Sequence, residues 1–268
     1  MQKVILITGI STGFGRKTAE MLAERGHIVY GTVRKQTEVK PGINVLTMDL
    51  TDQKSVQLAV DQVIQKEGRI DVLINNAGVH TGGAIETTTL ENARLQLDTN
   101  IMGLVYMLRE VLPIMRKQKQ GTLINFSSIG GLMGLPFQGF YSASKFAIEG
   151  LSEALRMELR QFNIKVVLIN PGDFHTNNTA NRRNFLANSA DDPYAAQFQK
   201  SLAIIEKDET HGWPPEVLAR KLVKIAEAKN PCHRYVIASA EQKLAVLLKR
   251  ILPSAWFMKI LAPHYGIK

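Results

Sequence analysis

The strongest constraint on the fold is a regular alternation between short β-branched runs and longer segments with helical periodicity. Alternation of this kind is typical of a parallel sheet whose strands are joined by crossover helices. Strands are expected at 4–7, 28–32, 44–48, 72–74, 121–126 and 166–169, and helices at 16–25, 55–68, 90–118 in two pieces, and 142–160. The pattern predicts an α/β fold with a doubly wound parallel sheet.

The regularity weakens after Pro171. Residues 173–192 are rich in Asn, Thr and Ser, which favours a loop. We therefore expect a late insertion over 173–212 that covers a substrate. The Pro-Pro pair at 214–215 then starts a helix, and 235–237 forms a last strand.

Glycines punctuate residues 8–15, between the first expected strand and the first expected helix. Glycine lets the backbone approach a pyrophosphate, which the N-terminus of the following helix then stabilises. The spacing Gly-x-x-x-Gly-x-Gly departs from the common Gly-x-Gly-x-x-Gly, so a plain glycine turn is the alternative. The favoured interpretation is a Rossmann-type cofactor site that uses Gly9, Ser11, Thr12, Gly13, Phe14 and Gly15.

The end of the second expected strand indicates which dinucleotide is bound. Sites that prefer NAD usually place an acid there, where it accepts hydrogen bonds from the ribose. Residues 31–35 contain no acid and end on Arg34 and Lys35. A guanidinium can bind a 2′-phosphate through paired, charge-assisted hydrogen bonds. The sequence therefore favours NADP, with NAD less favoured, unless Arg34 is a solvated surface residue.

Tyr141 and Lys145 are four residues apart in an expected helix, so they share one helical face. An ammonium near a phenol stabilises the phenolate and lowers its pKa, which makes a tyrosine usable as a general acid or base. This spacing also recurs by chance in many helices.

The ensemble of motifs is more specific than any one of them. The glycine segment 8–15 is followed by Asn-Asn-Ala-Gly at 75–78, by Ser-Ser at 127–128, and by Tyr141. In this arrangement the chain resembles the classical short-chain dehydrogenase/reductases, from Lys3 to about Thr176. The resemblance implies one domain, residues 1–268, that transfers a hydride between NADP(H) and an alcohol or carbonyl without a metal.

The resemblance also implies four catalytic roles. Tyr141 would exchange a proton with the substrate oxygen, and Ser128 would hydrogen-bond that oxygen. Lys145 would lower the pKa of Tyr141 and hold the nicotinamide ribose. Asn100 would position a water in the proton relay.

Further cofactor contacts follow from the resemblance. Asp49 and Leu50 would flank the adenine, and Asn76, Ala77 and Gly78 would line the ribose. The carboxamide segment would comprise Pro171, Gly172, the Phe174 backbone and Thr176. Tyr141 and Lys145 would touch the cofactor as well. For Asp173 and His175, a loop surface or a hydrogen-bonded cap is favoured over an acid-base role.

The substrate is expected to be a bulky, apolar alcohol or ketone. Residues 32–34 and 125–128 look like those of the hydroxysteroid and retinol dehydrogenase branch. This resemblance implies a steroid-, retinoid- or lipid-like substrate, and smaller or polar carbonyl compounds are the alternative. The residues expected to form an apolar wall are Leu132, Met133, Leu135, Phe137 and Phe140, and a lid could come from Phe185, Leu186, Tyr194 and Phe198.

The formal net charge of +9 is concentrated at the C-terminus, since residues 229–268 carry seven basic side chains against one acid. Within a basic extension at 241–268, apolar residues follow helical spacing at Leu244, Leu247, Leu248 and Ile251. The extension could rest on an anionic membrane or cover the substrate pocket. Packing on its own domain or on a partner subunit is favoured over a membrane.

Other partners follow from composition and family. The sequence contains no recognised nucleic-acid-binding module and no basic stripe with stacking aromatics. A nucleic-acid partner is therefore not expected. The resemblance implies a homodimer or homotetramer formed through the helices around Asn100 and Tyr141, with Leu104, Met107, Leu108 and Leu151 as candidate surface residues. The alternative function is a catalytically silent regulator that binds NADP(H).

The cellular setting is expected to be cytoplasmic. The single cysteine, Cys232, cannot form an intrachain disulfide, and no Cys and His pair has zinc-ligand spacing. No apolar run reaches the roughly 18 residues of a membrane span.

Overall fold

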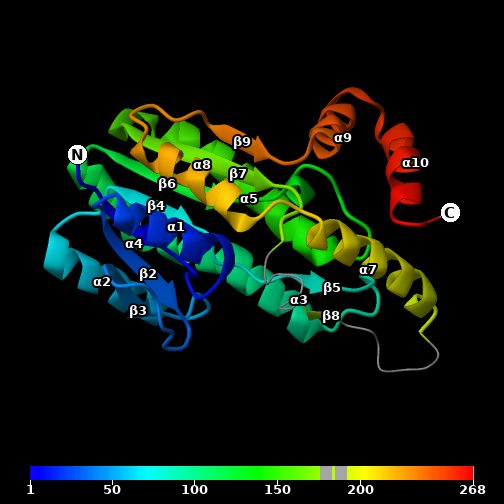
Figure 1. Cartoon of the computed structure of the whole chain (residues 1–268), viewed down its shortest axis with the longest axis horizontal. Coiled ribbons are helices and arrows are strands. Elements are labelled where there is room, and N and C mark those ends of the chain that lie inside the picture. The colour runs from blue at the N-terminus through cyan, green and yellow to red at the C-terminus, as the bar shows by residue number, and fades with distance from the viewer. Residues whose placement is uncertain (176–182, 185–191, 268) are drawn as a thin grey trace.

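The computed structural model describes residues 1–175, 183–184 and 192–267 and contains a doubly wound parallel sheet with helices on both faces (Figure 1). Within these residues, seven strands lie in the order β3-β2-β1-β4-β6-β7-β9, and every neighbouring pair is parallel. Their bounds are β1 Val4–Ile7, β2 Ile28–Val33, β3 Ile43–Thr47, β4 Val72–Asn75, β6 Gly121–Phe126, β7 Ile164–Pro171 and β9 Arg234–Ile237. The predicted α/β class and Rossmann-type single domain are confirmed.

The helices form two layers. Their bounds are α1 Gly13–Glu24, α2 Gln53–Glu67, α3 Leu90–Leu97, α4 Gly103–Gln118, α5 Gly139–Glu158, α7 Ala195–Thr210, α8 Pro215–Glu227, α9 Ala240–Ile251 and α10 Ser254–His264. Buried side chains of α2, α4 and α5 pack with one face of the sheet, and those of α1 and α8 pack with the other. Each strand of the sheet therefore has an apolar layer on both sides, as parallel sheets require.

The order of the strands places a crevice at the carboxyl ends of β1 and β4. After β1 the chain builds β2 and β3 on one side, then returns to form β4 on the other side of β1. The connections diverge at this point, which is where open α/β sheets bind their ligands.

Several boundaries differ from the sequence expectation. The two predicted pieces over 90–118 are joined by a π-helical turn, Asp98–Met102, into one helical stretch that holds Asn100. The expected insertion contains the helix α7, which composition did not indicate. A two-residue strand β5, Thr81–Gly82, pairs with β8, Arg183–Asn184.

One expectation about the surface is wrong. Leu104, Met107 and Leu108 were expected to form an apolar interface, but they are buried in the core beneath α4. Leu151 is partly buried against the same cluster. Helical periodicity marks an apolar face without saying whether the sheet or another subunit covers it.

Candidate active site

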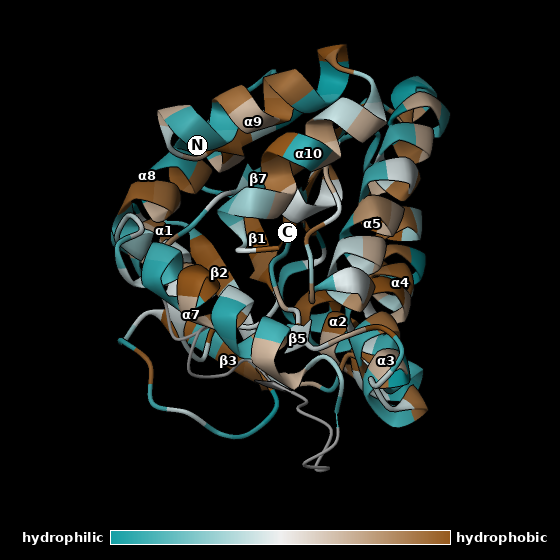
Figure 2. Cartoon of the chain, turned by 90° about the vertical axis from the view of Figure 1, so that its right-hand side faces the viewer, coloured by the Kyte–Doolittle hydropathy of each residue, from teal (hydrophilic) through white to brown (hydrophobic). Residues whose placement is uncertain are grey.

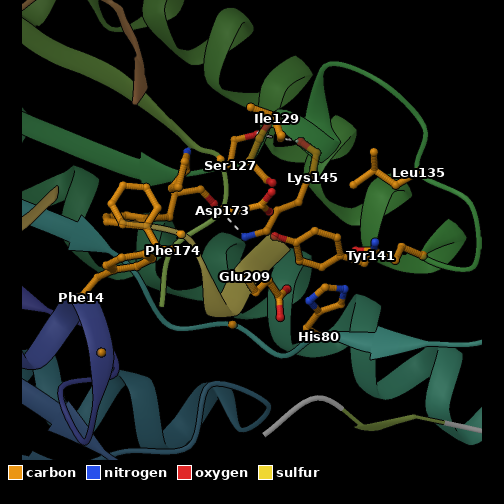
Figure 3. Close-up of a pocket in the computed structure, with 18 of the residues that line it drawn as sticks. Phe14, His80, Ser127, Ile129, Leu135, Tyr141, Lys145, Asp173, Phe174 and Glu209 are labelled. Carbon is orange, nitrogen blue, oxygen red and sulfur yellow. Dashed lines mark hydrogen bonds between the residues drawn. The ribbon is translucent and has the colours of Figure 1, made fainter. Parts of the chain in front are cut away.

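A cavity of about 1300 Å³ opens at the carboxyl edge of the sheet. One end is lined by the glycine segment after β1 and by the ends of β2 and β4. The other end is lined by residues of α7, α9 and α10. Ser128, Tyr141 and Lys145 of the predicted catalytic group line the cavity. Figure 3 shows Tyr141 and Lys145 among its lining residues.

The glycine segment lies against the loop after β4 so closely that side chains are excluded. Gly9 has φ of +73°, and a Cβ there would lie 2.8 Å from the Ala77 Cβ. Gly13, with φ of +60°, lines the cavity beside Ser11, Thr12 and Phe14. Such a cradle of backbone at a helix N-terminus fits a dinucleotide pyrophosphate.

A side chain is excluded at Gly15 for a different reason. Gly15 does not line the cavity, and a Cβ there would lie 2.2 Å from the Gly9 carbonyl oxygen and 2.5 Å from Asn76 Nδ2. Asn76 Nδ2 donates to the carbonyls of Thr8 and Gly9, both at 2.9 Å. Gly15 thus allows the first turn of α1 to approach the loop that Asn76 stabilises.

Thr8 is a further residue of this site, which motif spacing did not single out. Its hydroxyl accepts from the backbone N–H groups of Asn76, at 3.1 Å, and Ala77, at 3.0 Å. The Asn-Asn-Ala-Gly loop is thereby fixed to the end of β1, with Asn76, Ala77 and Gly78 facing the cavity.

Arg34, which follows β2, lines the cavity together with Asp49 and Leu50, which follow β3. A hydrogen bond from the Thr51 backbone, aided by the Arg34 charge, lowers the pKa of Asp49. No acid replaces Arg34 at the strand end. This edge of the cavity therefore presents a guanidinium.

Lys145 is buried, although it lines the cavity. Its Nζ donates to the Phe126 carbonyl at 2.9 Å and is 5.6 Å from the centroid of the Tyr141 ring. Burial lowers the pKa of Lys145 to about 8, although the Glu149 carboxylate opposes this change. α5 begins at Gly139, so Tyr141 and Lys145 share a helical face as predicted.

Tyr141 is stacked on His80, which sequence reasoning did not identify. The ring centroids are 3.9 Å apart and the planes differ by 20° (Figure 3). Gln96 Nε2 donates to the carbonyl of Val79, the residue before His80, at 2.6 Å. This bond holds the segment that carries His80, and the stacked imidazole limits the orientation of the Tyr141 phenol.

Asn100 connects the two sides of this stack. Its Oδ1 accepts from the Val79 N–H at 2.8 Å, and its Nδ2 donates to Ser144 Oγ at 3.0 Å. Ser144 Oγ in turn donates to the Tyr141 carbonyl at 2.7 Å. Asn100 lines a small space beside the main cavity rather than the main cavity itself.

Ser128 follows β6 and lines the cavity. Its Oγ accepts from the Gly130 N–H at 3.0 Å, and its carbonyl accepts from Asn170 Nδ2, also at 3.0 Å. The first bond occupies an oxygen lone pair and leaves the hydroxyl hydrogen to donate.

The segment after β7 lies next to this group. Pro171, Gly172 and Phe174 line the cavity, while Thr176 lies outside the described residues. The Phe174 ring packs edge-on against Phe14 at 5.0 Å between centroids, so its side chain serves packing, as expected.

Four carboxylic acids face the substrate end of the cavity: Asp173, Asp208, Glu209 and Glu241 of α9. Burial raises the pKa of Asp173 to about 6, and the charges of Glu209 and Asp208 add to the effect. Asp173 accepts from Gln242 Nε2 of α9 at 2.5 Å. Asp173 was expected on a loop surface or as a hydrogen-bonded cap, and it also lines the cavity. His175 is exposed, and its Nδ1 lies 3.0 Å from the Thr210 carbonyl oxygen.

The expected apolar wall is partly wrong. Met133 and Leu135 line the cavity, but Leu132, Phe137 and Phe140 do not. Of the expected lid residues, Phe198 packs on Phe137 and Tyr194 donates to Glu86, so neither lines the cavity. Phe185 and Leu186 lie outside the described residues. The C-terminal helices supply the apolar surface instead, through Leu244, Ala245, Leu248, Phe257, Ile260 and Leu261.

Comparison with known proteins places this site in a family. Residues 3–187 match the family model described as short chain dehydrogenase. The chain is 48% identical over 266 residues to a 3-ketodihydrosphingosine reductase of Bacteroides thetaiotaomicron, covering 99% of each protein. It is 33% identical over 246 residues to an NADPH-dependent 3-dehydrocapnine reductase of Ornithobacterium rhinotracheale, covering 87% of each. A short-chain dehydrogenase from Streptomyces avermitilis superimposes with a TM-score of 0.82 at 28% identity, covering 97% of this chain and 96% of that one.

Proposed function

Because the chain belongs to the short-chain dehydrogenase family of oxidoreductases, which act on carbonyl and alcohol groups, we propose that it uses NADPH to reduce the ketone of a long-chain amino-ketone lipid. The observation that carries the proposal is one cavity that joins Ser128, Tyr141 and Lys145 to an apolar end with acidic side chains.

The catalytic residues act on the ketone oxygen. Tyr141 donates its phenolic proton to this oxygen, and Ser128 donates a hydrogen bond that stabilises the charge developing there. NADPH, when bound, would supply the hydride for the carbonyl carbon and become NADP⁺, so that the C=O π bond would be replaced by new C–H and O–H bonds. The Lys145 ammonium favours the phenolate left on Tyr141.

Asn100 and Gly78 provide space for reprotonation. A Cβ on Gly78 would lie 3.1 Å from Asn100 Oδ1 and 3.8 Å from Lys145 Nζ. A water in this space can hydrogen-bond to both groups, because glycine leaves it open. Asn100 would hold this water, and Lys145 would return a proton to Tyr141 through it.

The cofactor is bound by the residues at the other end. The backbone of Gly9 and Gly13 holds the pyrophosphate, and Asn76 supports that loop. Arg34 binds the 2′-phosphate, which supports NADPH over NADH. The NADPH-dependent relative is consistent with this choice.

The acidic residues indicate the substrate class. 3-Ketodihydrosphingosine, the substrate in the name of the 48% identical relative, is a long-chain ketone with an amine beside the carbonyl. Its ammonium would lie near Asp173, Asp208 and Glu209, and its alkyl chain along the apolar residues of α9 and α10. A steroid or retinoid has no cation to place beside these carboxylates.

The test is NADPH oxidation with 3-ketodihydrosphingosine and with a ketone of equal chain length that lacks the amine. The amino ketone should have the higher kcat/KM, and Tyr141→Phe should lower kcat by about 10²–10⁴-fold while NADPH still binds. NADPH binding without turnover of either ketone would instead favour a silent regulator.

Asp173→Asn tests the amine contact separately. The variant should lower kcat/KM for the amino ketone by about tenfold or more, since a hydrogen bond to a charged group contributes about 1.5–3 kcal/mol, and should leave the amine-free ketone unchanged. In the wild type, Asp173 loses its charge as the pH falls through about 6, so the preference for the amino ketone should decline below that pH. An equal loss for both ketones would rule out the amine contact.

A further inference from the structure

The C-terminal helices α9 and α10 expose an unusual number of large apolar side chains. Six of them are between 51% and 65% exposed: Leu244, Leu247, Ile251, Trp256, Met258 and Ile260. The two helices stand at one end of the molecule, beyond the carboxyl end of β9 (Figures 1 and 2). Isolated exposed apolar residues are ordinary, but a contiguous group marks an interaction surface.

On α9 the exposed apolar residues form a stripe bordered by positive charge. Leu244, Leu247 and Ile251 have i, i+3, i+7 spacing and share one face. Lys243 and Arg250, seven residues apart, lie beside this stripe and are also exposed. With Lys249 and Lys259, the two helices carry four lysine and arginine side chains against one acid, Glu241.

This combination fits an anionic lipid bilayer. Apolar side chains enter the boundary between head groups and acyl chains, and flanking lysine and arginine attract anionic head groups. A second copy of this chain fits less well, because a symmetric contact would bring the same positive charges together. No helix in the described ranges is long and apolar enough to cross a membrane, so a bilayer contact here lies at its surface.

The mouth of the active-site cavity lies on the same face. Leu244 and Ile260 line the cavity and are also more than half exposed. They therefore stand at its opening, with Leu248 and Leu261 lining the cavity further along.

We propose that the exposed face of α9 and α10 docks on an anionic lipid bilayer, and that the lipid substrate passes from the bilayer into the cavity between Leu244 and Ile260. The docking stands on exposure and charge, and the passage of a lipid rests on the proposed function. The face positions the cavity mouth at the membrane, so that the alkyl chain need not cross water.

The test is flotation of the full chain with vesicles of phosphatidylcholine alone and with vesicles that also contain phosphatidylglycerol. The protein should float with the anionic vesicles, and added salt should weaken binding. The variant with Leu247→Ser, Ile251→Ser and Trp256→Ser, none of which lines the cavity, should lose binding. The variant with Lys243→Glu and Arg250→Glu should bind anionic vesicles at least about fivefold more weakly per changed residue.

The matched control carries Phe146→Ser and Met157→Ser, which remove exposed apolar side chains of α5, and it should float like the wild type. Absence of flotation by the wild type, or equal loss in the control, would overturn the proposal. Sedimentation in which the triple variant alone changes from dimer to monomer would also overturn it, by making the face a subunit interface.

Turnover of a short-chain, water-soluble amino ketone separates this proposal from the proposed function. The triple variant should reduce it at the wild-type rate, but should lose activity on vesicle-bound 3-ketodihydrosphingosine. Flotation without any reductase activity would leave the docking face standing and reject the function. Reductase activity without flotation would reject the docking face alone.

Discussion

The cofactor half and the substrate half of the cavity are built in different ways. At the cofactor half, the loops after β1 and β4 are joined by hydrogen bonds through Thr8 and Asn76, and a methyl group on Gly9 or Gly15 would collide with backbone. At the substrate half, α9 has no buried residue and α10 has Phe257 alone. Backbone contact defines one half, and a thin layer of side chains defines the other.

The difference shows how a single fold can serve many substrates. The cofactor half has to match one rigid ligand, and its backbone geometry leaves little room for substitution. The substrate half rests on a small cluster around Ile129, Met133, Ala238 and Phe257, separate from the two large cores of the sheet. Its residues can change without disturbing the sheet, as expected where function is grafted on a common fold.

Lys145→Met should give the largest effect, with opposite signs for activity and stability. Activity should fall by about 10²–10⁴-fold, because Tyr141 loses the charge that favours its phenolate. The folded-state pKa of about 8 lies below the usual 10.5, so burying the ammonium costs on the order of 3 kcal/mol below pH 8. Allowing for the lost bond to Phe126, the variant should be about 1–2 kcal/mol more stable at pH 7 in urea unfolding.

The size of the stability effect of Lys145→Met depends on pH. The cost of the buried ammonium fades as the pH rises from about 8 toward 10.5, so the advantage of the variant should shrink across that window. Lys54→Met, at an exposed position of α2, is the control and should change neither property. A variant less stable than the wild type at pH 7 would contradict the desolvation argument.

Phe257→Ala should loosen the substrate half alone. Truncating a buried phenylalanine removes about 3–5 kcal/mol of packing, here from the contacts that hold α10 to the domain. The KM for the ketone should rise, and the amides of α9 and α10 should exchange faster, while NADPH affinity stays constant. Met157→Ala, an exposed truncation in α5, serves as the control. Weaker NADPH binding in Phe257→Ala would show that the two halves are coupled.

Arg34→Ala should affect the cofactor half alone. The dissociation constant for NADPH should rise by about 10–100-fold, since charge-assisted hydrogen bonds contribute about 1.5–3 kcal/mol, and that for NADH should not change. Fluorescence titration with each cofactor measures both values. Lys35→Ala, next along the chain but outside the cavity lining, is the matched control. Equal weakening for NADH would argue against a 2′-phosphate contact.

Gly15→Ala should give the smallest effect, a destabilisation of about 1–3 kcal/mol with weaker binding of either cofactor, because the new methyl group must displace the Gly9 carbonyl. Gly150→Ala in α5 meets open space and should instead stabilise by about 0.5–1 kcal/mol. Thermal unfolding of both variants compares them directly. Equal stability of the two variants would mean that the loop tolerates a shift.

Local patterns predicted much of the fold because parallel strands and their helices have distinct periods. The strands of the large sheet through residue 171 were placed within a few residues, although the short strand β5 was not expected. The helix that carries Tyr141 and Lys145 was expected from the helical pattern of its segment. The motif residues after β1, β4 and β6 meet in one cavity because the carboxyl ends of parallel strands share an edge. Their chemical roles stay predictions until the variants are measured.

The sequence by itself predicted the elements and the cofactor loop, since each depends on neighbours within a few positions. The candidate catalytic residues came from the family resemblance of its motifs, taken in order along the chain. Only the tertiary structure brought His80 against Tyr141, placed Asp173 beside Gln242, and set α9 and α10 across the cavity mouth. These contacts join residues separated by about sixty positions or more. No local period encodes such distances, because they depend on how the sheet orders its strands and where the chain returns.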